Sequence, residues 1–319
     1  MAAVPLIQVQ GLTKYFGPRP AIVDVTFSVP RGQVLGFLGP NGAGKSTTMR
    51  ILTGYLGATS GTASVAGYDV FDHSLEVRRR VGYLPELNPL YSELRVEPYL
   101  ELMCRLRGVP PSRRRERIGS AVEACGLVDR RHEVISRLSK GLRQRVGLAQ
   151  AVVHDPDVLI LDEPTAGLDP RQTRETRDLI KGLGERHTVV LSSHVLSEVQ
   201  ATCERVVIID GGRLVADDTP QGLSKRLGTG RTHQVEALVR GAEPDVRKCL
   251  EAARGVKQVR LSDAGDEEWQ VVVEGTGPDL EDSVARAVVG SGLKLRELRT
   301  RTLSLEDVFL KLTREGKSR

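Results

Sequence analysis

The sequence is short of aromatic and cysteine residues, and each shortage excludes a class of protein. Aromatic side chains make up only 4% of the 319 residues, which argues against a nucleic-acid surface built from rings that stack on bases. The four cysteines lie far apart and show neither metal-ligand spacing nor a disulfide framework. We therefore expect a reduced, cytoplasmic protein.

Long apolar runs are also missing. No run approaches the roughly 20 residues that a membrane-spanning helix needs, and Met1–Pro5 lacks the charged start and apolar core of a signal peptide. The length predicts one large domain with a smaller one, or two domains. A net charge of +5 and a pI near 9.1 are compatible with a surface that faces anionic lipid or nucleic acid.

A glycine-rich stretch is the most informative motif. The run Gly39–Thr47 fits G-x-x-x-x-G-K-[ST], the Walker A or phosphate-binding loop. It follows an apolar strand at 33–38 and opens a helix, so free backbone N–H groups and the helix dipole point at phosphate. We expect Lys45 to reach the outer phosphates and the Ser46 hydroxyl to bind Mg²⁺. The predicted nucleotide contacts in the loop are Gly39, Pro40, Asn41, Gly42, Ala43, Gly44, Lys45, Ser46 and Thr47.

Two carboxylates end a second apolar strand. Val158–Leu161 is fully apolar, as central strands of parallel sheets are, and Asp162 and Glu163 follow it. Carboxylates at the end of a buried strand are costly unless they act on something. Asp162 is therefore predicted to hold Mg²⁺, and Glu163 to act as general base toward the attacking water. The alternative, a capped strand end with solvated carboxylates, is disfavoured because the chain already contains a Walker A loop.

Three other polar features point to the same chemistry. Ser139 and Gly141 offer a hydroxyl and backbone N–H groups near a helix start, which makes a second anion site. His194 follows the apolar strand 188–191. A lone histidine at the end of a strand is usually a polar group with a hydrogen-bond partner, but next to the Walker motifs His194 is a candidate to contact the γ-phosphate. Tyr15 lies in a hairpin and either stacks on an adenine ring or packs on the sheet.

Arginines crowd a pair of helices predicted over residues 95–126. Apolar residues recur there at helical spacing, interrupted at Gly108–Ser112. The arginines form either a solvated helix face, which we favour, or a surface held near anionic membrane headgroups. They are Arg105, Arg107, Arg113, Arg114, Arg115 and Arg117.

The C-terminal part of the chain follows another pattern, beyond a boundary predicted near Leu227–Arg231. Strand, helix, strand, strand, helix and strand succeed one another, which is the βαββαβ order of a small ferredoxin-like domain. Ser304–Asp307 is predicted to form a capping box that opens a last helix. This part of the chain is either a small-ligand regulatory module or a dimerisation or stability element, and we favour the second.

Together these motifs resemble the ATP-binding cassette (ABC) transporter ATPases over residues 4–222. The signature loop is similar to Leu138–Leu142, Walker B to Val158–Asp162 and the D-loop to Ala166–Asp169. The resemblance implies an α/β P-loop NTPase cassette with a RecA-like core, an antiparallel β subdomain and a helical subdomain.

Domain limits follow from the resemblance. The ABC ATP-binding domain would span residues 1–228, with its helical subdomain at about 87–155. The ferredoxin-like accessory domain would span residues 229–319.

In this family two cassettes close head to tail on two ATP molecules, so a homodimer is expected. Ser139 and Gly141 would contact the γ-phosphate held by the partner chain, Asp169 would join the nucleotide contacts, and Tyr15 would stack on adenine. The cofactors would be ATP and Mg²⁺. The catalytic residues implied by the resemblance are Lys45, Glu163 and His194.

The resemblance also implies a membrane partner. Closure of the dimer would drive a separate multi-span transmembrane permease, and the chain would be cytoplasmic and peripheral on the inner face of the cell membrane. No nucleic acid is expected as a partner. The rival hypothesis is a soluble ABC ATPase that acts on the ribosome or nucleic acid, but such proteins usually join two cassettes or insert a long coiled coil.

Three positions depart from the commonest family pattern. Lys140 and Leu142 replace a glycine and the glutamine of the Leu-Ser-Gly-Gly-Gln signature. Glu86 stands where the family often has the Q-loop glutamine, and it joins Ser46 and Asp162 as a predicted group near Mg²⁺. These variants and the C-terminal extension resemble the cassettes of two-component exporters of the drug-resistance and gliding-motility type, which predicts export.

Overall fold

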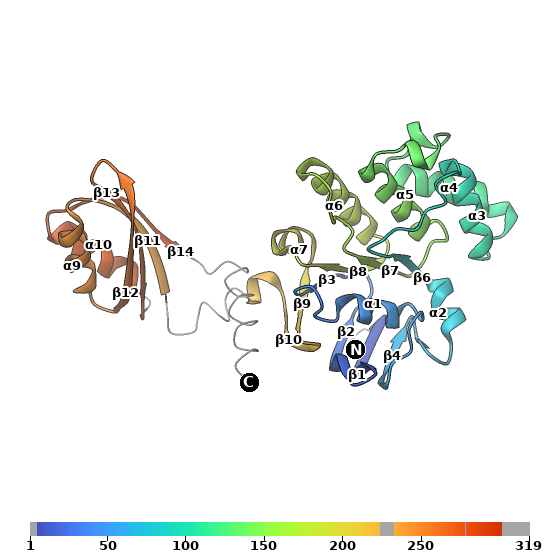
Figure 1. Cartoon of the computed structure of the whole chain (residues 1–319), viewed down its shortest axis with the longest axis horizontal. Coiled ribbons are helices and arrows are strands. Elements are labelled where there is room, and N and C mark those ends of the chain that lie inside the picture. The colour runs from blue at the N-terminus through green and yellow to red at the C-terminus, as the bar shows by residue number, and fades with distance from the viewer. Residues whose placement is uncertain (1–4, 224–232, 278, 302–319) are drawn as a thin grey trace. The chain divides into compact units, whose positions relative to one another are not determined.

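The computed structural model describes residues 5–223, 233–277 and 279–301. Its internal contacts divide the chain into two compact units, one ending at Pro220 and the other beginning at Gln221. Figure 1 shows the elements of both units. Within the described residues, no helix combines the length and apolarity that crossing a bilayer requires.

A six-stranded sheet forms the centre of the first unit. Five strands are parallel and the edge strand β10 is antiparallel to β9. All residues of the three central strands are buried, which explains their continuous apolar sequences, since both faces of a parallel sheet are covered. The strands in spatial order are β10 (Arg213–Asp218), β9 (Arg205–Asp210), β3 (Val34–Leu38), β8 (Thr188–Ser193), β7 (Val158–Asp162) and β6 (Val81–Leu84).

An antiparallel sheet lies beside it, with the order β2-β1-β4-β5. Its first hairpin is longer than the sequence predicts. Positive φ angles at Gly11 and Asp24 accompany shifts in register along this hairpin. These shifts hide the alternation of apolar residues from which the strands were predicted. The strands are β1 (Ile7–Phe16), β2 (Arg19–Val29), β4 (Ser60–Val65) and β5 (Tyr68–Asp69).

Helix α1 (Lys45–Leu52) lies between the two sheets (Figure 1). Its residues Met49, Ile51 and Leu52 join a core built from the facing sides of both sheets. Phe27 of β2 and Phe37 of β3 meet in this core with their ring centroids 5.5 Å apart. The helix that follows the glycine-rich loop is therefore fixed by packing on both sides.

Helices α5 (Lys140–Val152), α6 (Pro170–Gly184) and α7 (Leu196–Thr202) cover the opposite face of the six-stranded sheet (Figure 1). The contact between β6 and α5 is close: a Cβ on Gly82 would overlap the carbonyl oxygen of Ala151. Only glycine allows this approach.

The remaining helices of the first unit form the part richest in arginine. Helices α3 and α4 pack on each other and on α5, and the turn between α3 and α4 contains Gly108 with φ of 73°. Both helices were predicted from their apolar spacing. The elements are α2 (Ser74–Arg80), α3 (Val96–Leu106), α4 (Pro111–Ala124), and the 3₁₀ turns η1 (Val128–Arg130) and η2 (Ile135–Arg137).

The second unit has the element order β-α-β-β-α-β, as the sequence predicts. Its sheet has the order β12-β13-β11-β14, and apolar residues of α9 and α10 pack with the buried sheet residues in one core. The predicted boundary segment Leu227–Arg231 and capping box Ser304–Asp307 lie outside the described residues. The elements are β11 (His233–Arg240), α9 (Glu243–Glu251), β12 (Val256–Gly265), β13 (Glu268–Gly275), α10 (Leu280–Gly290) and β14 (Lys294–Arg301).

Candidate active site

The glycine-rich loop joins the end of β3 to the start of α1. A Cβ on Gly39 would meet the backbone of Ile209, and one on Gly44 would lie 2.7 Å from the carbonyl oxygen of Ala21. Gly44 also has φ of 106°, which side-chain-bearing residues rarely adopt. The loop is therefore wrapped closely around the N-terminus of α1, with its backbone available to a ligand.

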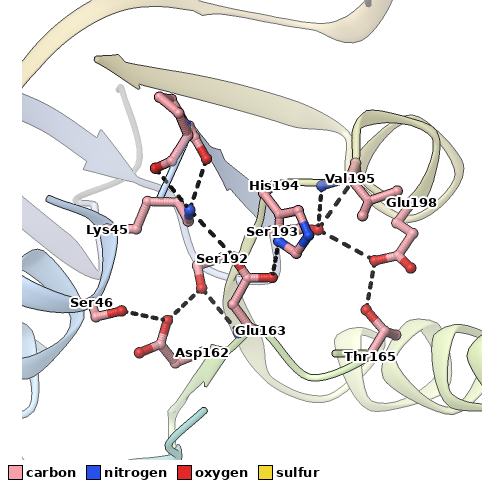
Figure 2. Close-up of polar contacts among 12 residues, drawn as sticks. Lys45, Ser46, Asp162, Glu163, Thr165, Ser192, Ser193, His194, Val195 and Glu198 are labelled. Atoms are coloured by element: carbon pink, nitrogen blue, oxygen red, sulfur yellow. Dashed lines mark hydrogen bonds and ion pairs between the residues drawn. The ribbon is translucent and has the colours of Figure 1, made fainter. Parts of the chain in front are cut away.

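Lys45 is buried, with only 5% of its surface exposed. Its Nζ donates hydrogen bonds to the carbonyl oxygens of Gly39, at 2.7 Å, and Pro40, at 3.3 Å. The same ammonium lies 3.3 Å from Oε1 of Glu163 (Figure 2). The positive charge is thus held inside the loop, where a phosphate chain would lie.

Asp162 ends β7 with its carboxylate buried among hydroxyl groups. Oδ1 accepts hydrogen bonds from Ser46 Oγ, at 3.2 Å, and from Ser192 Oγ, at 2.6 Å (Figure 2). Ser192 also accepts a hydrogen bond from the backbone N–H of Glu163, at 3.0 Å. Ser192 was missed by the sequence analysis, and its only signal there was its place at the end of the strand that leads to His194.

Glu163 has a left-handed backbone, with φ of 50°, and its residue is 6% exposed. Oε2 lies 2.8 Å from Nδ1 of His194, while Oε1 makes no hydrogen bond and faces Lys45 (Figure 2). A positive φ at a residue with a side chain is costly and is found where the surrounding structure enforces it. Here the unusual backbone directs the carboxylate between two basic groups.

A second polar network fixes the segments on either side of the site. Glu198 at the start of α7 accepts hydrogen bonds from Thr165 Oγ1, at 2.5 Å, and Ser193 Oγ, at 3.3 Å. Ser193 also accepts from the N–H of Val195, at 2.9 Å (Figure 2). These contacts tie the turn after Glu163 to the turn that carries His194.

Lys45, Ser46, Glu163 and His194 line one open cleft of about 380 Å³, whereas Asp162 and Ser192 are not part of its lining. The structure brings together residues from the glycine-rich loop, from Glu86, and from the ends of β7 and β8. Two of the lining residues, Ala21 and Ala166, were not predicted. The lining residues predicted from the sequence are Pro40, Asn41, Gly42, Gly44, Lys45, Ser46, Thr47, Glu86, Glu163 and His194.

Residues 22–166 match the protein family described as ABC transporter. Over 318 residues the chain is 35% identical to YhcH, an uncharacterized ABC transporter ATP-binding protein of Bacillus subtilis. The match covers 98% of this chain and 97% of the relative. The chain belongs to the ABC transporter ATP-binding proteins. As a member of this family, it is an ATPase subunit.

Other members of the family are similarly close to this ABC ATPase. The daunorubicin/doxorubicin resistance ATP-binding protein DrrA of Streptomyces peucetius is 34% identical over 312 residues, which cover 96% of this chain and 92% of DrrA. A solved structure of an ATP-binding subunit of an ABC transporter is 30% identical, with a TM-score of 0.63. It covers 70% of this chain and 93% of its own. The expected cassette fold is confirmed.

Six residues predicted to contact nucleotide lie outside the lining of the cleft, and two of them, Gly39 and Ala43, belong to the glycine-rich loop. Tyr15 is half-exposed on the first hairpin and pairs with Pro20, beside the cleft residue Ala21. Ser139 Oγ instead caps α5, and Asp169 caps α6. Gly141 is buried beside α6. Their roles stay predictions.

The cleft of this ABC ATPase has the chemistry that Mg²⁺ and phosphate require. Ser46 and Asp162 present hard oxygen donors side by side, and Mg²⁺ in nucleotide sites takes few protein ligands, with water and phosphate oxygens completing its shell. Accordingly, the described residues contain no group of three or more His, Cys, Asp or Glu side chains placed to hold a metal alone. The residues present therefore fit a metal that arrives with ATP.

The departures from the usual ABC signature have a structural context. Lys140 reaches the D-loop of its own chain. Its Nζ lies so close to Gly167 that a Cβ at that position would collide with it. Gln144, one turn further along α5, donates a hydrogen bond to the carbonyl oxygen of Pro164, at 2.9 Å. The signature helix is thus attached to the segment that follows Glu163.

Proposed function

We propose that this ABC ATPase hydrolyses ATP in the cleft between Lys45 and Glu163, and that hydrolysis drives export through a separate permease. The observation that carries the proposal is the position of Glu163, whose two carboxylate oxygens face Lys45 and His194. A carboxylate held beside a phosphate-binding loop is placed to act on water. Similarity to DrrA, a drug-resistance protein, supports the direction of transport.

The residues of the cleft would divide the work of phosphoryl transfer. Backbone N–H groups of the loop and the ammonium of Lys45 would bind the phosphates and stabilise the charge that develops on them. Ser46 and Asp162 would hold Mg²⁺, which supplies neutralisation of phosphate charge when bound. Ser192 keeps the carboxylate of Asp162 in place.

Glu163 would take a proton from the attacking water. His194 Nδ1 lies 2.8 Å from Oε2 and so fixes the orientation of the carboxylate, while its imidazole side chain, 48% exposed, is free to approach the γ-phosphate. Glu86, which lines the same cleft, would hold water near the metal.

The proposal includes a head-to-tail homodimer. Ser139, Gly141 and Asp169 do not line the cleft of their own chain, as expected if they serve the ATP bound by a partner. The permease would be a multi-span membrane protein, and this chain would lie at the cytoplasmic face of the membrane through that contact.

The test uses Glu163→Gln, purified from detergent-solubilised membranes in the presence of ATP. We expect ATP to stay bound, the hydrolysis rate to fall by at least about 100-fold, and a multi-span protein to purify with the variant. Glu198→Gln, a change in the neighbouring network that does not line the cleft, should retain most of the activity. Hydrolysis at the wild-type rate by Glu163→Gln would remove Glu163 as the base, and bound ribosomes or nucleic acid would support the rival function.

A further inference from the structure

A second polar hollow lies at the opposite ends of the central strands from the ATPase cleft. It has a volume of about 280 Å³ and is lined by the α3–α4 turn and by His154 and Asp155. These two residues precede β7, whereas Asp162 ends that strand. The hollow therefore has no residue in common with the ATPase cleft.

Three arginines and one carboxylate line the hollow. Arg117 pairs with Asp155, with Nη2 and Oδ2 2.8 Å apart. Arg113, one helical turn earlier, makes no side-chain hydrogen bond or ion pair with the described residues and is exposed. Arg107, Arg113 and Arg117 contribute three positive charges and Asp155 one negative charge, so the lining carries a net charge of about +2 with His154 neutral.

Arg107 is not a solvated surface arginine. Its Nη1 donates hydrogen bonds to the backbone carbonyl oxygens of Arg78, at 2.5 Å, and Val81, at 3.5 Å. Burial lowers the pKa of its guanidinium, and the positive charge of Arg78 adds to this effect. No carboxylate among the described residues pairs with it. Arg107 is partly buried, and a guanidinium that has lost part of its hydration without gaining a counter-ion would be stabilised by a bound anion.

Two other features of the wall differ in what they offer an anion. The neutral imidazole of His154 donates from Nε2 to the carbonyl oxygen of Val81, at 3.2 Å, so its buried Nδ1 carries a lone pair and offers no donor. Helix α4 begins in the wall of the hollow, with no side-chain cap and no acidic residue in its first turn. The dipole of the helix adds to the positive potential, although Pro110 and Pro111 at its start have no N–H to donate.

We propose that this hollow binds the phosphate group of an anionic ligand. Guanidinium groups present parallel donors that match phosphate oxygens, and a helix N-terminus supports the same class of ligand. Of the arginines expected to form a solvated face, Arg105, Arg113 and Arg115 are exposed, whereas Arg107, Arg114 and Arg117 are partly buried. The arginines are divided among roles: Arg105 and Arg114 pair with Glu101 on the helical hairpin, and Arg107, Arg113 and Arg117 converge on the hollow.

The chain offers a matched pair of variants for the test. Arg113→Glu reverses a charge in the lining, and Arg115→Glu makes the same change two residues along α4 at an exposed position outside the lining. Neither residue has a side-chain partner among the described residues, so both variants should fold with unchanged circular dichroism and thermal midpoint. The net charge of the two variants is identical.

The first measurement is calorimetric titration of the full chain with inorganic pyrophosphate, with ADP held at saturation to fill the ATPase cleft. The second is flotation with phosphatidylglycerol vesicles, with phosphatidylcholine vesicles as control. We expect Arg113→Glu to weaken one of these interactions by about tenfold or more and Arg115→Glu by less than about twofold.

The two measurements separate the sources of the phosphate. If Arg113→Glu selectively loses pyrophosphate binding, the ligand of the hollow is a free phosphate compound. If it selectively loses vesicle binding, the ligand is a lipid headgroup. Equal effects of the two variants would reduce the arginines to a general surface charge and overturn the proposal. Absence of both interactions in the wild-type chain would overturn it as well.

Discussion

At the scale of single residues, the active site depends on a few hydrogen bonds to buried carboxylates. Glu163 is directed by its left-handed backbone, by Lys45 and by His194. Asp162 is directed by two hydroxyl groups, of which only Ser46 belongs to a motif that the sequence reveals. Ser192 therefore has a role that can be tested separately.

Ser192→Ala would leave the N–H of Glu163 without its hydrogen-bond partner and Asp162 Oδ1 with the hydroxyl of Ser46 alone. Residues that orient a metal ligand affect metal affinity by about 10- to 100-fold. We expect the Mg²⁺ concentration that half-saturates ATPase activity to rise by about tenfold or more. Ser193→Ala, which removes contacts to Val195 and Glu198 instead, is the control. Equal Mg²⁺ dependence of the two variants would argue against a positioning role for Ser192.

His154 predicts a pH dependence of stability. Burial, followed by the charge of Arg107, lowers its pKa from 6.5 to about 4. The unfolded chain therefore binds a proton below about pH 6.5 that the folded chain does not bind until about pH 4. The free energy of unfolding should decrease as the pH is lowered through that window. The contribution is at most about 3 kcal/mol at pH 4.

The measurement compares urea unfolding of the wild-type chain and His154→Gln from pH 7 to 4.5 in phosphate-free buffer. The variant should lose less stability across this window than the wild-type chain. Parallel stability curves for the two proteins would show that His154 is not kept neutral by the fold.

At the scale of elements, the contact between β6 and α5 connects the Glu86 turn with the signature helix. Gly82→Ala would place a Cβ against the carbonyl oxygen of Ala151, and backbone cannot yield as a flexible side chain would. We expect a loss of about 1–3 kcal/mol in the free energy of unfolding, measured by urea denaturation.

Gly119→Ala in α4 is the control for this substitution. A Cβ at Gly119 meets no atom within 4 Å, and alanine is the better helix former. The change should be neutral or stabilise by up to about 1 kcal/mol. Similar losses in the free energy of unfolding for both variants would mean that the close contact between β6 and α5 does not cause the destabilisation by Gly82→Ala.

At the scale of the whole molecule, the two units have separate apolar cores. One core is formed by residues of the antiparallel sheet, α1 and the central strands, and the other lies entirely within the second unit. The cassette should therefore fold without the second unit. The favoured interpretation of that unit, as a dimerisation or stability element, is open to a direct test.

A chain that stops after Gly228 should remain folded and bind ATP. In the Glu163→Gln background, we expect this truncation to shift the ATP-dependent dimer toward monomer, measured by size-exclusion chromatography with light scattering. The full-length Glu163→Gln chain is the reference. An unchanged dimer and an unchanged thermal midpoint would exclude both roles for residues 229–319.

The sequence by itself determined the motifs whose chemistry depends on local order. Gly39–Thr47 specifies a phosphate loop because glycines, Lys45 and Ser46 must follow one another along the backbone, and the apolar run Val158–Leu161 specifies a central strand. Helical spacing likewise revealed α3 and α4, and alternation revealed the strands of the second unit.

Tertiary structure decided what depends on segments far apart in the chain. Ser192 meets Asp162 only because β7 and β8 pair in register. The arginines of one helical hairpin receive different roles because α3, α4 and the segment before β7 place different partners beside them. Spacing along one helix shows which residues share a face, but the charge opposite that face comes from another part of the chain.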